Sequence, residues 1–363
     1  MSPSTATLLY AVIARRIPSM RAQLAVLLVC PSALLSAPAQ PCAGIEVQLA
    51  QARQAISQKN ADDAGRILSP LLASHPGCPE LLLSLARVRG VEGDVAVAND
   101  LFVRYTALAP KDASGYYYFA RFLFNTGAFD RAAEVTEQAV SLDPRYAAAL
   151  VLKGKLLGMR GETAAAEQTL RQACTLDPSD AVAHFELGSV YDTAKRNREA
   201  VEQFEKVVAI NPQDPGAWDY LALNLEPLGE IDRAAKAYQQ GLAVNQGPGK
   251  DSFLDYNYGR FLAKQNRLEE SIKHLDRAVM VAPEMRAVRY ERAKVNFRLH
   301  HYREASADAE KALQLADPAG IIIDLQVYYL LESIYRRLGE TGLADKYAAL
   351  SRNTPVPARK QRQ

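Results

Sequence analysis

The sequence predicts an all-α solenoid, an array of stacked helix–turn–helix units, and three observations support this prediction. Prolines recur along the chain with a near-constant spacing of 34 residues. Between them, apolar residues recur at intervals of three and four, the period of a helix that buries one face. Glycine stands near the middle of several intervals, where it allows the positive φ that ends a helix. A period of 34 is typical of a helical pair that stacks on copies of itself.

The first 39 residues are predicted to be a signal peptide that lies outside the array. Arg15, Arg16 and Arg21 precede an apolar run from Leu24 to Leu35, and Ala37-Pro38-Ala39 follows it. A charged start, a short apolar core and a small-x-small end are the three parts of a secretory signal. The apolar run is short for a membrane span, although an uncleaved membrane anchor remains the alternative.

The predicted signal peptide also bears on where the chain starts and on whether the protein is exported. The stretch before Arg15 is longer than usual, so either Met1 or Met20 is the start. We expect the protein to be exported, to the periplasm or outside the cell. Contact with a membrane is expected only if the N-terminal segment is uncleaved.

Two cysteines flank the first helical pair. Cys42 stands just before it and Cys78 just after it. Because an antiparallel pair brings its two ends together, we expect a disulfide between them, and an exported protein can hold one.

Residues 113–146 show the pattern of one unit. Its first helix has an apolar face, Asn125-Thr126-Gly127 forms the turn, and a second helix ends before Pro144, since the residue before a proline leaves the helical region. The pattern predicts an array of eight to nine units over residues 40–354. The units begin near Ile45, Pro79, Ala113, Ala147, Ala181, Pro215, Ser252, Arg286 and Leu325.

Three segments depart from the pattern. Residues 246–250, which contain Gly247 and Gly249, replace a proline turn and add three residues, and no strand precedes them as a phosphate-binding loop would require. The last unit follows the apolar residues 321–323, and its register is the least defined. Residues 355–363 are predicted to be a disordered basic tail.

The units resemble the tetratricopeptide repeat over nearly the whole chain after the signal segment. That family has small residues at its eighth position, where two helices cross closely, and at its twentieth. The eighth positions here are Ala52, Ala86, Ala120, Gly154, Gly188, Ala222, Gly259 and Ala293. The twentieth are Ala64, Ala98, Ala132, Ala166, Ala200, Ala234, Ser271, Ala305 and Ala344. The resemblance implies a right-handed superhelix whose first helices line a concave groove, and a role in protein binding.

No pattern in the sequence predicts catalysis. The five histidines are scattered, and no metal-ligand spacing, nucleophile motif or cofactor motif is present, so we expect no catalytic, metal or cofactor site. The formal net charge of +2 argues against nucleic acid as a partner. A stacked array offers a long surface for partners rather than a pocket of convergent catalytic groups.

One set of residues repeats at positions that the resemblance places in the groove. The ninth positions carry Arg53, Arg87, Arg121, Lys155, Arg260 and Lys294, and the thirteenth carry Lys264 and Arg298. The fifth positions carry Tyr117, Phe185, Tyr256, Tyr290 and Tyr329. An ordinary solvated helix face is the alternative, but a stripe of one charge at one repeated position favours a basic, aromatic groove.

These patterns together predict a non-catalytic scaffold of the bacterial-type periplasm or cell envelope that binds an extended acidic peptide or protein segment. Two alternatives stay open: a membrane-anchored assembly factor of the envelope, and an accessory subunit that delivers substrate to an enzyme. The sequence leaves the partner, the pathway and the oligomeric state undefined.

Overall fold

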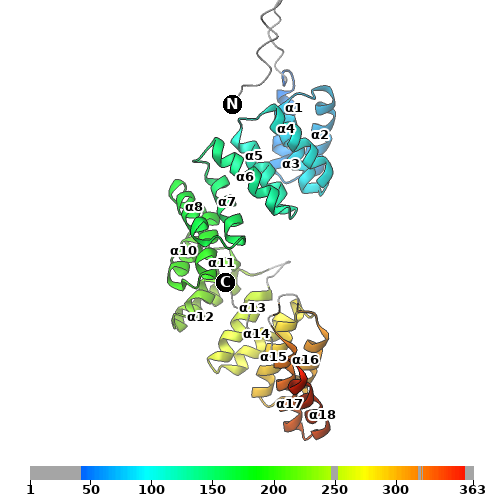
Figure 1. The fold of residues 1–363 in the computed structure, drawn as a ribbon, viewed down its shortest axis with the longest axis vertical. Helices are drawn as coiled ribbons and strands as arrows, with labels where there is room; N and C mark the ends of the chain where they lie inside the picture. Colours follow the sequence, from blue (N-terminus) through cyan, green and yellow to red (C-terminus); the bar gives the residue numbers. More distant parts are fainter. Residues whose placement is uncertain (1–41, 247–251, 318–319, 321, 356–363) are drawn as a thin grey trace, which may run out of the picture.

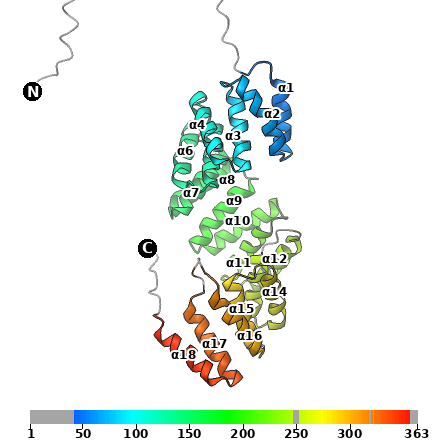
Figure 2. The ribbon, with the colours of Figure 1, turned by 90° about the vertical axis from the view of Figure 1, so that its right-hand side faces the viewer.

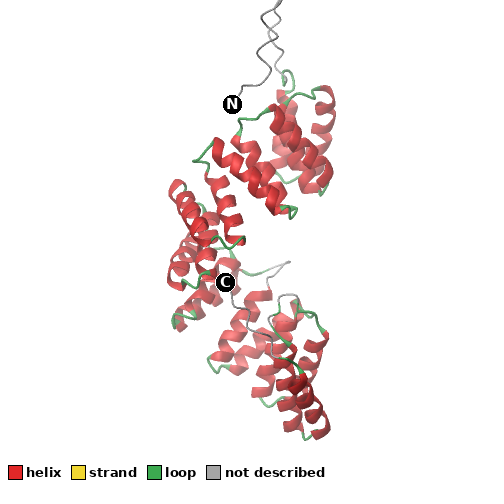
Figure 3. Ribbon diagram, viewed as in Figure 1, coloured by secondary structure: helices red, strands yellow, loops and turns green. Residues whose placement is uncertain are grey.

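The computed structural model describes residues 42–246, 252–317, 320 and 322–355. These residues form eighteen α-helices and no strand, which confirms the predicted all-α solenoid (Figure 3). The predicted signal peptide, residues 247–250 of the inserted loop, and the predicted tail beyond Pro355 lie outside the described residues.

The helices form nine consecutive antiparallel pairs. The first helices of the pairs are α1 (Glu46–Ser57), α3 (Pro79–Glu92), α5 (Ala113–Asn125), α7 (Ala147–Met159), α9 (Ala181–Thr193), α11 (Pro215–Leu225), α13 (Ser252–Lys264), α15 (Arg286–Arg298) and α17 (Asp324–Leu338). The second helices are α2 (Ala61–Ser74), α4 (Val95–Leu108), α6 (Phe129–Leu142), α8 (Thr163–Leu176), α10 (Asn197–Ile210), α12 (Ile231–Val244), α14 (Leu268–Val281), α16 (Tyr302–Gln314) and α18 (Thr341–Asn353).

The pairs follow one another along the length of the molecule, so that α1 and α18 lie at opposite ends (Figures 1 and 2). The first helices begin at the predicted unit starts or one residue away: α1 begins at Glu46 rather than Ile45, and α17 at Asp324 rather than Leu325. The most weakly patterned unit therefore still forms a complete pair.

Local sequence explains where many of these helices begin. Pro79 and Pro215 occupy the first position of α3 and α11, where a missing N–H costs nothing. The side chains of Asp112, Asp180 and Asp214 accept hydrogen bonds from backbone N–H groups at the starts of α5, α9 and α11. Such caps satisfy donors that have no partner within the helix.

The turn inside each pair requires one residue in the left-handed region. Glycine occupies this place in five pairs, at Gly93, Gly127, Gly161, Gly229 and Gly339. In the other four pairs the residue is not glycine: Lys59, Lys195, Asn266 and His300 have φ between 59° and 66°. The sequence pattern identifies only the glycine turns, because stacking of the two helices imposes the same backbone path on residues that do not favour it.

These strained turns lead to a first prediction. Replacing Lys195 (φ 60°) by glycine should raise the free energy of unfolding by about 1 kcal/mol, since glycine adopts this conformation without a Cβ clash. Gly127→Ala is the reverse change at the equivalent turn (φ 80°) and should lower stability by a similar amount. Thermal unfolding of the two variants measures both effects, and equal shifts of the same sign would show that the turn geometry is misassigned.

The core is continuous from one pair to the next. Buried apolar side chains form three clusters, over residues 45–156, 150–262 and 256–347. The first two clusters both draw on α7, and the last two both draw on α13. Because these helices are shared, the array forms one stack rather than separate domains.

The first helices form the inner row of the stack. They contact each other between neighbouring units, as α1 contacts α3 and α13 contacts α15. Among the described helices, no two second helices approach each other as closely. The array therefore curves with the first helices on the inside, and their exposed faces line the groove.

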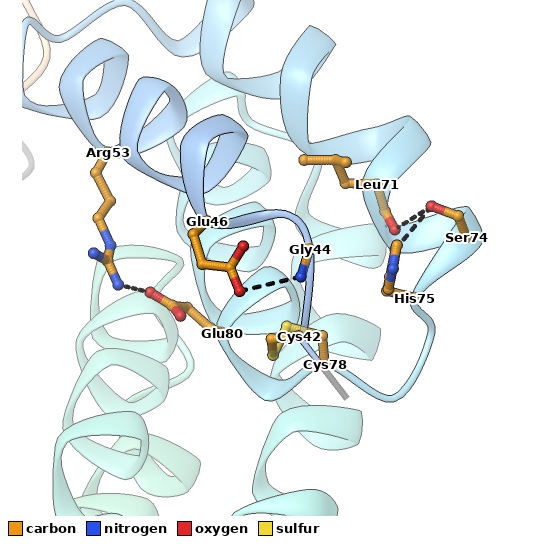
Figure 4. Close-up of a disulfide and its surroundings, with 9 residues drawn as sticks. All are labelled: Cys42, Gly44, Glu46, Arg53, Leu71, Ser74, His75, Cys78 and Glu80. Carbon is orange, nitrogen blue, oxygen red and sulfur yellow. Dashed lines mark hydrogen bonds and ion pairs between the residues drawn. A yellow bond between two sulfur atoms is a disulfide. The ribbon is translucent and has the colours of Figure 1, made fainter. Parts of the chain in front are cut away.

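A disulfide closes the N-terminal end of the array. Cys42, which precedes α1, is bonded to Cys78, the residue before α3, with the two Cα atoms 5.1 Å apart (Figure 4). The antiparallel path of α1 and α2 brings the two ends of the first unit together, as the sequence leads us to expect.

Candidate functional site

The repeated basic positions lie on the inner row of helices, and most of them contact an acidic side chain of the protein itself. Arg53 forms an ion pair with Glu80, across the boundary between the first two units (Figure 4). Lys155 Nζ lies 2.6 Å from Glu186 Oε1, one unit further along. These cations are thus partly neutralised by the next unit.

The basic residues of the C-terminal half are paired more completely. Arg260 and Lys264 both contact Glu226, at 3.7 and 2.7 Å, and the Glu226 side chain is only 10% exposed. Lys294 Nζ lies 2.9 Å from Glu291 Oε2 of the same helix. These contacts turn the C-terminal part of the stripe into a set of internal ion pairs.

Arg298 has a structural role that the sequence did not predict. Its guanidinium donates to the backbone oxygen of Ala263, at 2.7 Å, and to Asn266 Oδ1, at 2.8 Å. Ala263 is in the last turn of α13, where carbonyl groups lack partners within the helix, and Asn266 is in the turn that follows. Arg298 therefore caps the preceding unit.

The predicted aromatic residues of the groove differ in how much surface they offer. Tyr256 is 8% exposed, and burial raises its pKa to about 12. Phe185 packs edge-on against Phe204 and Tyr220. Tyr290 is partly buried, with Lys294 Nζ 5.4 Å from its ring centroid, whereas Tyr329 is 54% exposed. Tyr256 and Phe185 belong mainly to the packing between helices.

Two arginines of the stripe differ from the others. The guanidinium carbon of Arg87 lies 4.2 Å from the centroid of the Tyr118 ring, and that of Arg121 lies 5.2 Å from the same centroid. Neither guanidinium contacts an acidic side chain among the residues that the structure describes. Both positive charges are therefore available to a ligand, held in place by a shared aromatic ring.

Two further tyrosines, Tyr117 and Tyr146, extend the group formed by Arg87, Arg121 and Tyr118. The Tyr117 ring lies 5.3 Å from that of Tyr118 and 5.2 Å from that of Tyr146, measured between centroids. Burial raises the pKa of Tyr146 to about 12, and the nearby Tyr118 and Tyr117 add to the shift. The phenol keeps its proton and can donate a hydrogen bond. We call Arg87, Arg121, Tyr117, Tyr118 and Tyr146 the Arg–Tyr cluster.

The Arg–Tyr cluster borders a hollow of about 820 Å³ that is lined by residues of the first three units, from α1 to α5 and the turns between these helices. We call it the N-terminal hollow. Lys59, Arg87 and Arg121 are its three charged residues, and no carboxylate lines it. By contrast, the hollow between Leu223 and Gln265 contains Glu226 beside its two cations. The N-terminal hollow is thus positive, and its size is that of a small-ligand or side-chain site.

Sequence reasoning missed several residues of this hollow. Tyr118, Gly90 and Val91 stand at the sixth, twelfth and thirteenth positions of their units. The spacing of three and four from the ninth position would place Gly90, Val91 and Tyr118 beside the arginines, so this signal was present in the sequence. The pairing of most other cations of the stripe could not be seen in the sequence, because it depends on contacts between units; Lys294, which pairs with Glu291 of its own helix, is the exception.

Metal-binding clusters and membrane-spanning helices are both absent from the described residues. No group of three or more His, Cys, Asp or Glu side chains there could hold a metal ion. Among the helices that the structure describes, none has both the length and the apolar character needed to cross a membrane.

Comparisons with protein families match two adjoining parts of the chain. Residues 82–217 match the model described as "Cilia and flagella-associated protein 70 middle TPR-like domain", and residues 221–287 match the model described as "Tetratricopeptide repeat". The two matches meet at α11, and the second includes α13.

Two curated relatives share parts of the array. The chain is 28% identical over 166 residues, 43% of its length, to "Tetratricopeptide repeat and J domain-containing co-chaperone DNJ1" of Fusarium oxysporum f. sp. lycopersici, of which the match covers 31%. It is 32% identical over 111 residues, 31% of its length, to a "Peroxisomal targeting signal receptor" of Candida glabrata, of which the match covers 18%. The chain thus spans less than a third of either relative.

A solved structure shares the fold over most of the chain. It is the "APC/C hetero-tetramer Cut9-Hcn1", with a TM-score of 0.56 and 16% identity, over 82% of this chain and 57% of that chain. At this identity the likeness concerns the arrangement of helices alone.

Proposed function

Because the chain is a tetratricopeptide repeat protein, whose repeats indicate a protein-interaction scaffold, we propose that it binds an extended acidic peptide or protein segment in its inner groove. The observation that supports this most is the Arg–Tyr cluster. Arg87 and Arg121 are held beside Tyr118 and have no acidic partner among the described residues. A carboxylate is the ligand that guanidinium groups bind with paired hydrogen bonds.

The acidic segment binds at the first three units rather than along the whole stripe. The C-terminal cations already contact Glu226 and Glu291, so a ligand carboxylate would compete with internal partners there. The N-terminal hollow has no such competitor in its lining. The name of one relative, a targeting signal receptor, supports a role in recognising other polypeptides.

Charge reversal at the cluster should abolish most of this binding. We expect Arg87→Glu/Arg121→Glu to weaken binding of a labelled acidic peptide at least tenfold at low salt, because two attractive charges become repulsive. Wild-type affinity should also fall as salt rises. Fluorescence anisotropy measures both, with an Asn- and Gln-substituted peptide as the uncharged comparison.

The matched control makes the same charge change outside the groove. Arg198 and Lys206 are exposed on α10, a second helix, and form no ion pair within the described part of the chain. Arg198→Glu/Lys206→Glu should leave peptide binding near the wild-type value. Equal losses in the two double variants would mean that net charge, rather than the cluster, attracts the peptide.

We also propose that the scaffold acts after export, in the periplasm or outside the cell. Residues 1–39 have the three parts of a secretory signal, and a Cys42–Cys78 disulfide suits an oxidising compartment. The mass of the protein isolated from its native envelope tests this. A mature chain that begins near Gln40 is expected, and a retained first segment would favour the membrane-anchored alternative.

A further inference from the structure

The N-terminal hollow has an apolar part that the binding of a carboxylate does not use. Val91, on α3, is 80% exposed, and Val95, at the start of α4, is 48% exposed. Ile56 and Phe122 also line the hollow. Apolar side chains gathered in a concavity gain free energy when a ligand removes them from water.

Gly90 lets the Phe122 ring pack closely against α3 at the place where both residues line the hollow. A Cβ atom at Gly90 would lie 3.0 Å from Phe122 Cδ2, closer than side chains normally approach. The ring therefore occupies the place next to residue 90, and the apolar part of the hollow is the part lined by Phe122, Val91 and Val95.

Helix α3 sets the distance between the positive part and the apolar part of the N-terminal hollow. Arg87 and Val91 are four residues apart on α3, so they lie on one face about 6 Å apart along the axis. In an extended peptide, side chains i and i+2 point to the same side and are about 7 Å apart. The two spacings agree, so one extended segment can place a side chain in each part.

We infer that the N-terminal hollow recognises a paired feature: an Asp or Glu carboxylate at the Arg–Tyr cluster and a large apolar side chain, two positions away along the peptide, against Val91, Val95 and Phe122. This inference rests on the proposed binding of an acidic segment and adds its apolar requirement. A hollow lined by three cations and no carboxylate, with the exposed Val91 one helical turn from Arg87 and the exposed Val95 at the start of α4, is complementary to this pair of groups.

Random-peptide display on the whole chain tests the inference without a known partner. The wild type should enrich peptides with Asp or Glu two positions from Leu, Ile, Met or Phe. Val91→Asn/Val95→Asn should keep the acidic preference, lose the apolar one, and bind the best wild-type peptide about tenfold more weakly, because both valines are exposed and their loss leaves the core intact.

The control is Val103→Asn, which changes an exposed valine of α4 outside the hollow and should select the same peptides as the wild type. If the wild type enriches acidic peptides with no apolar residue at a fixed spacing, or if the double valine variant selects unchanged sequences, the apolar subsite is wrong and the acidic groove stands. If no acidic peptides are enriched, the proposed function fails together with the inference.

Discussion

Gly188→Leu is expected to destabilise the middle of the array by roughly 3 kcal/mol, the upper end of the range for overpacked cores. Gly188 is fully enclosed on α9, and even a Cβ atom there would lie 2.9 Å from Phe204 Cζ of α10. Phe204 is completely buried and stacks on Tyr220 of the next unit. It has no space to move into, so a leucine must separate the two helices of the pair.

The effect should spread from this pair to its neighbours, because each unit is stabilised by the units on either side. Thermal unfolding measures the loss, and hydrogen exchange should show it first in α9 and α10. Gly158→Ala is the matched control: it lies on α7, and its Cβ would meet Val190 at an ordinary 3.5 Å. That variant should be neutral or slightly stabilising through helix propensity. Unchanged unfolding of Gly188→Leu would mean that the helix crossing is looser than the structure shows.

The repeated fold could be predicted because its signals are local. Prolines, turn glycines and small residues at the crossings recur with one period, and each unit contacts only its neighbours. The positive φ at Lys59, Lys195, Asn266 and His300 could not be predicted, since nothing in those residue types demands it. There the shape of the neighbouring helices decides the backbone conformation.

The site could be predicted only in part. The sequence shows where basic residues stand, but not which of them form an ion pair with an acidic side chain of the protein. The ninth positions carry basic residues in both halves of the array, yet Arg260 contacts Glu226 while Arg121 lies against the rings of Tyr117 and Tyr118. Glu226 is at the end of α11, and Arg260 is on α13, 34 residues later in the sequence. Their contact arises from the stacking of two units, which no pattern within one unit reveals.

Loss of the Cys42–Cys78 disulfide is expected to have the second large effect on stability. The bond closes a loop with a sequence separation of 36, which corresponds to about 3–4 kcal/mol in the chain-entropy model. The loop contains α1 and α2, the first pair of the array, which has a neighbouring unit on one side only among the described residues. A terminal pair lacks half the stacking contacts of an inner pair, so the covalent link matters most there.

The double variant Cys42→Ala/Cys78→Ala tests the contribution of the disulfide. Alanine is used instead of serine because Cys78 is fully buried, and serine would bury a hydroxyl there. Hydrogen exchange should become faster in α1 and α2 while α9 to α18 keep their protection, because a stacked array frays from its ends. Reductant should have the same effect on the wild type and none on the variant. The loss should also weaken peptide binding, since Ile56 and Lys59 of the first unit line the N-terminal hollow. Unchanged exchange in α1 and α2 would show that packing against α3 alone holds the first unit in place.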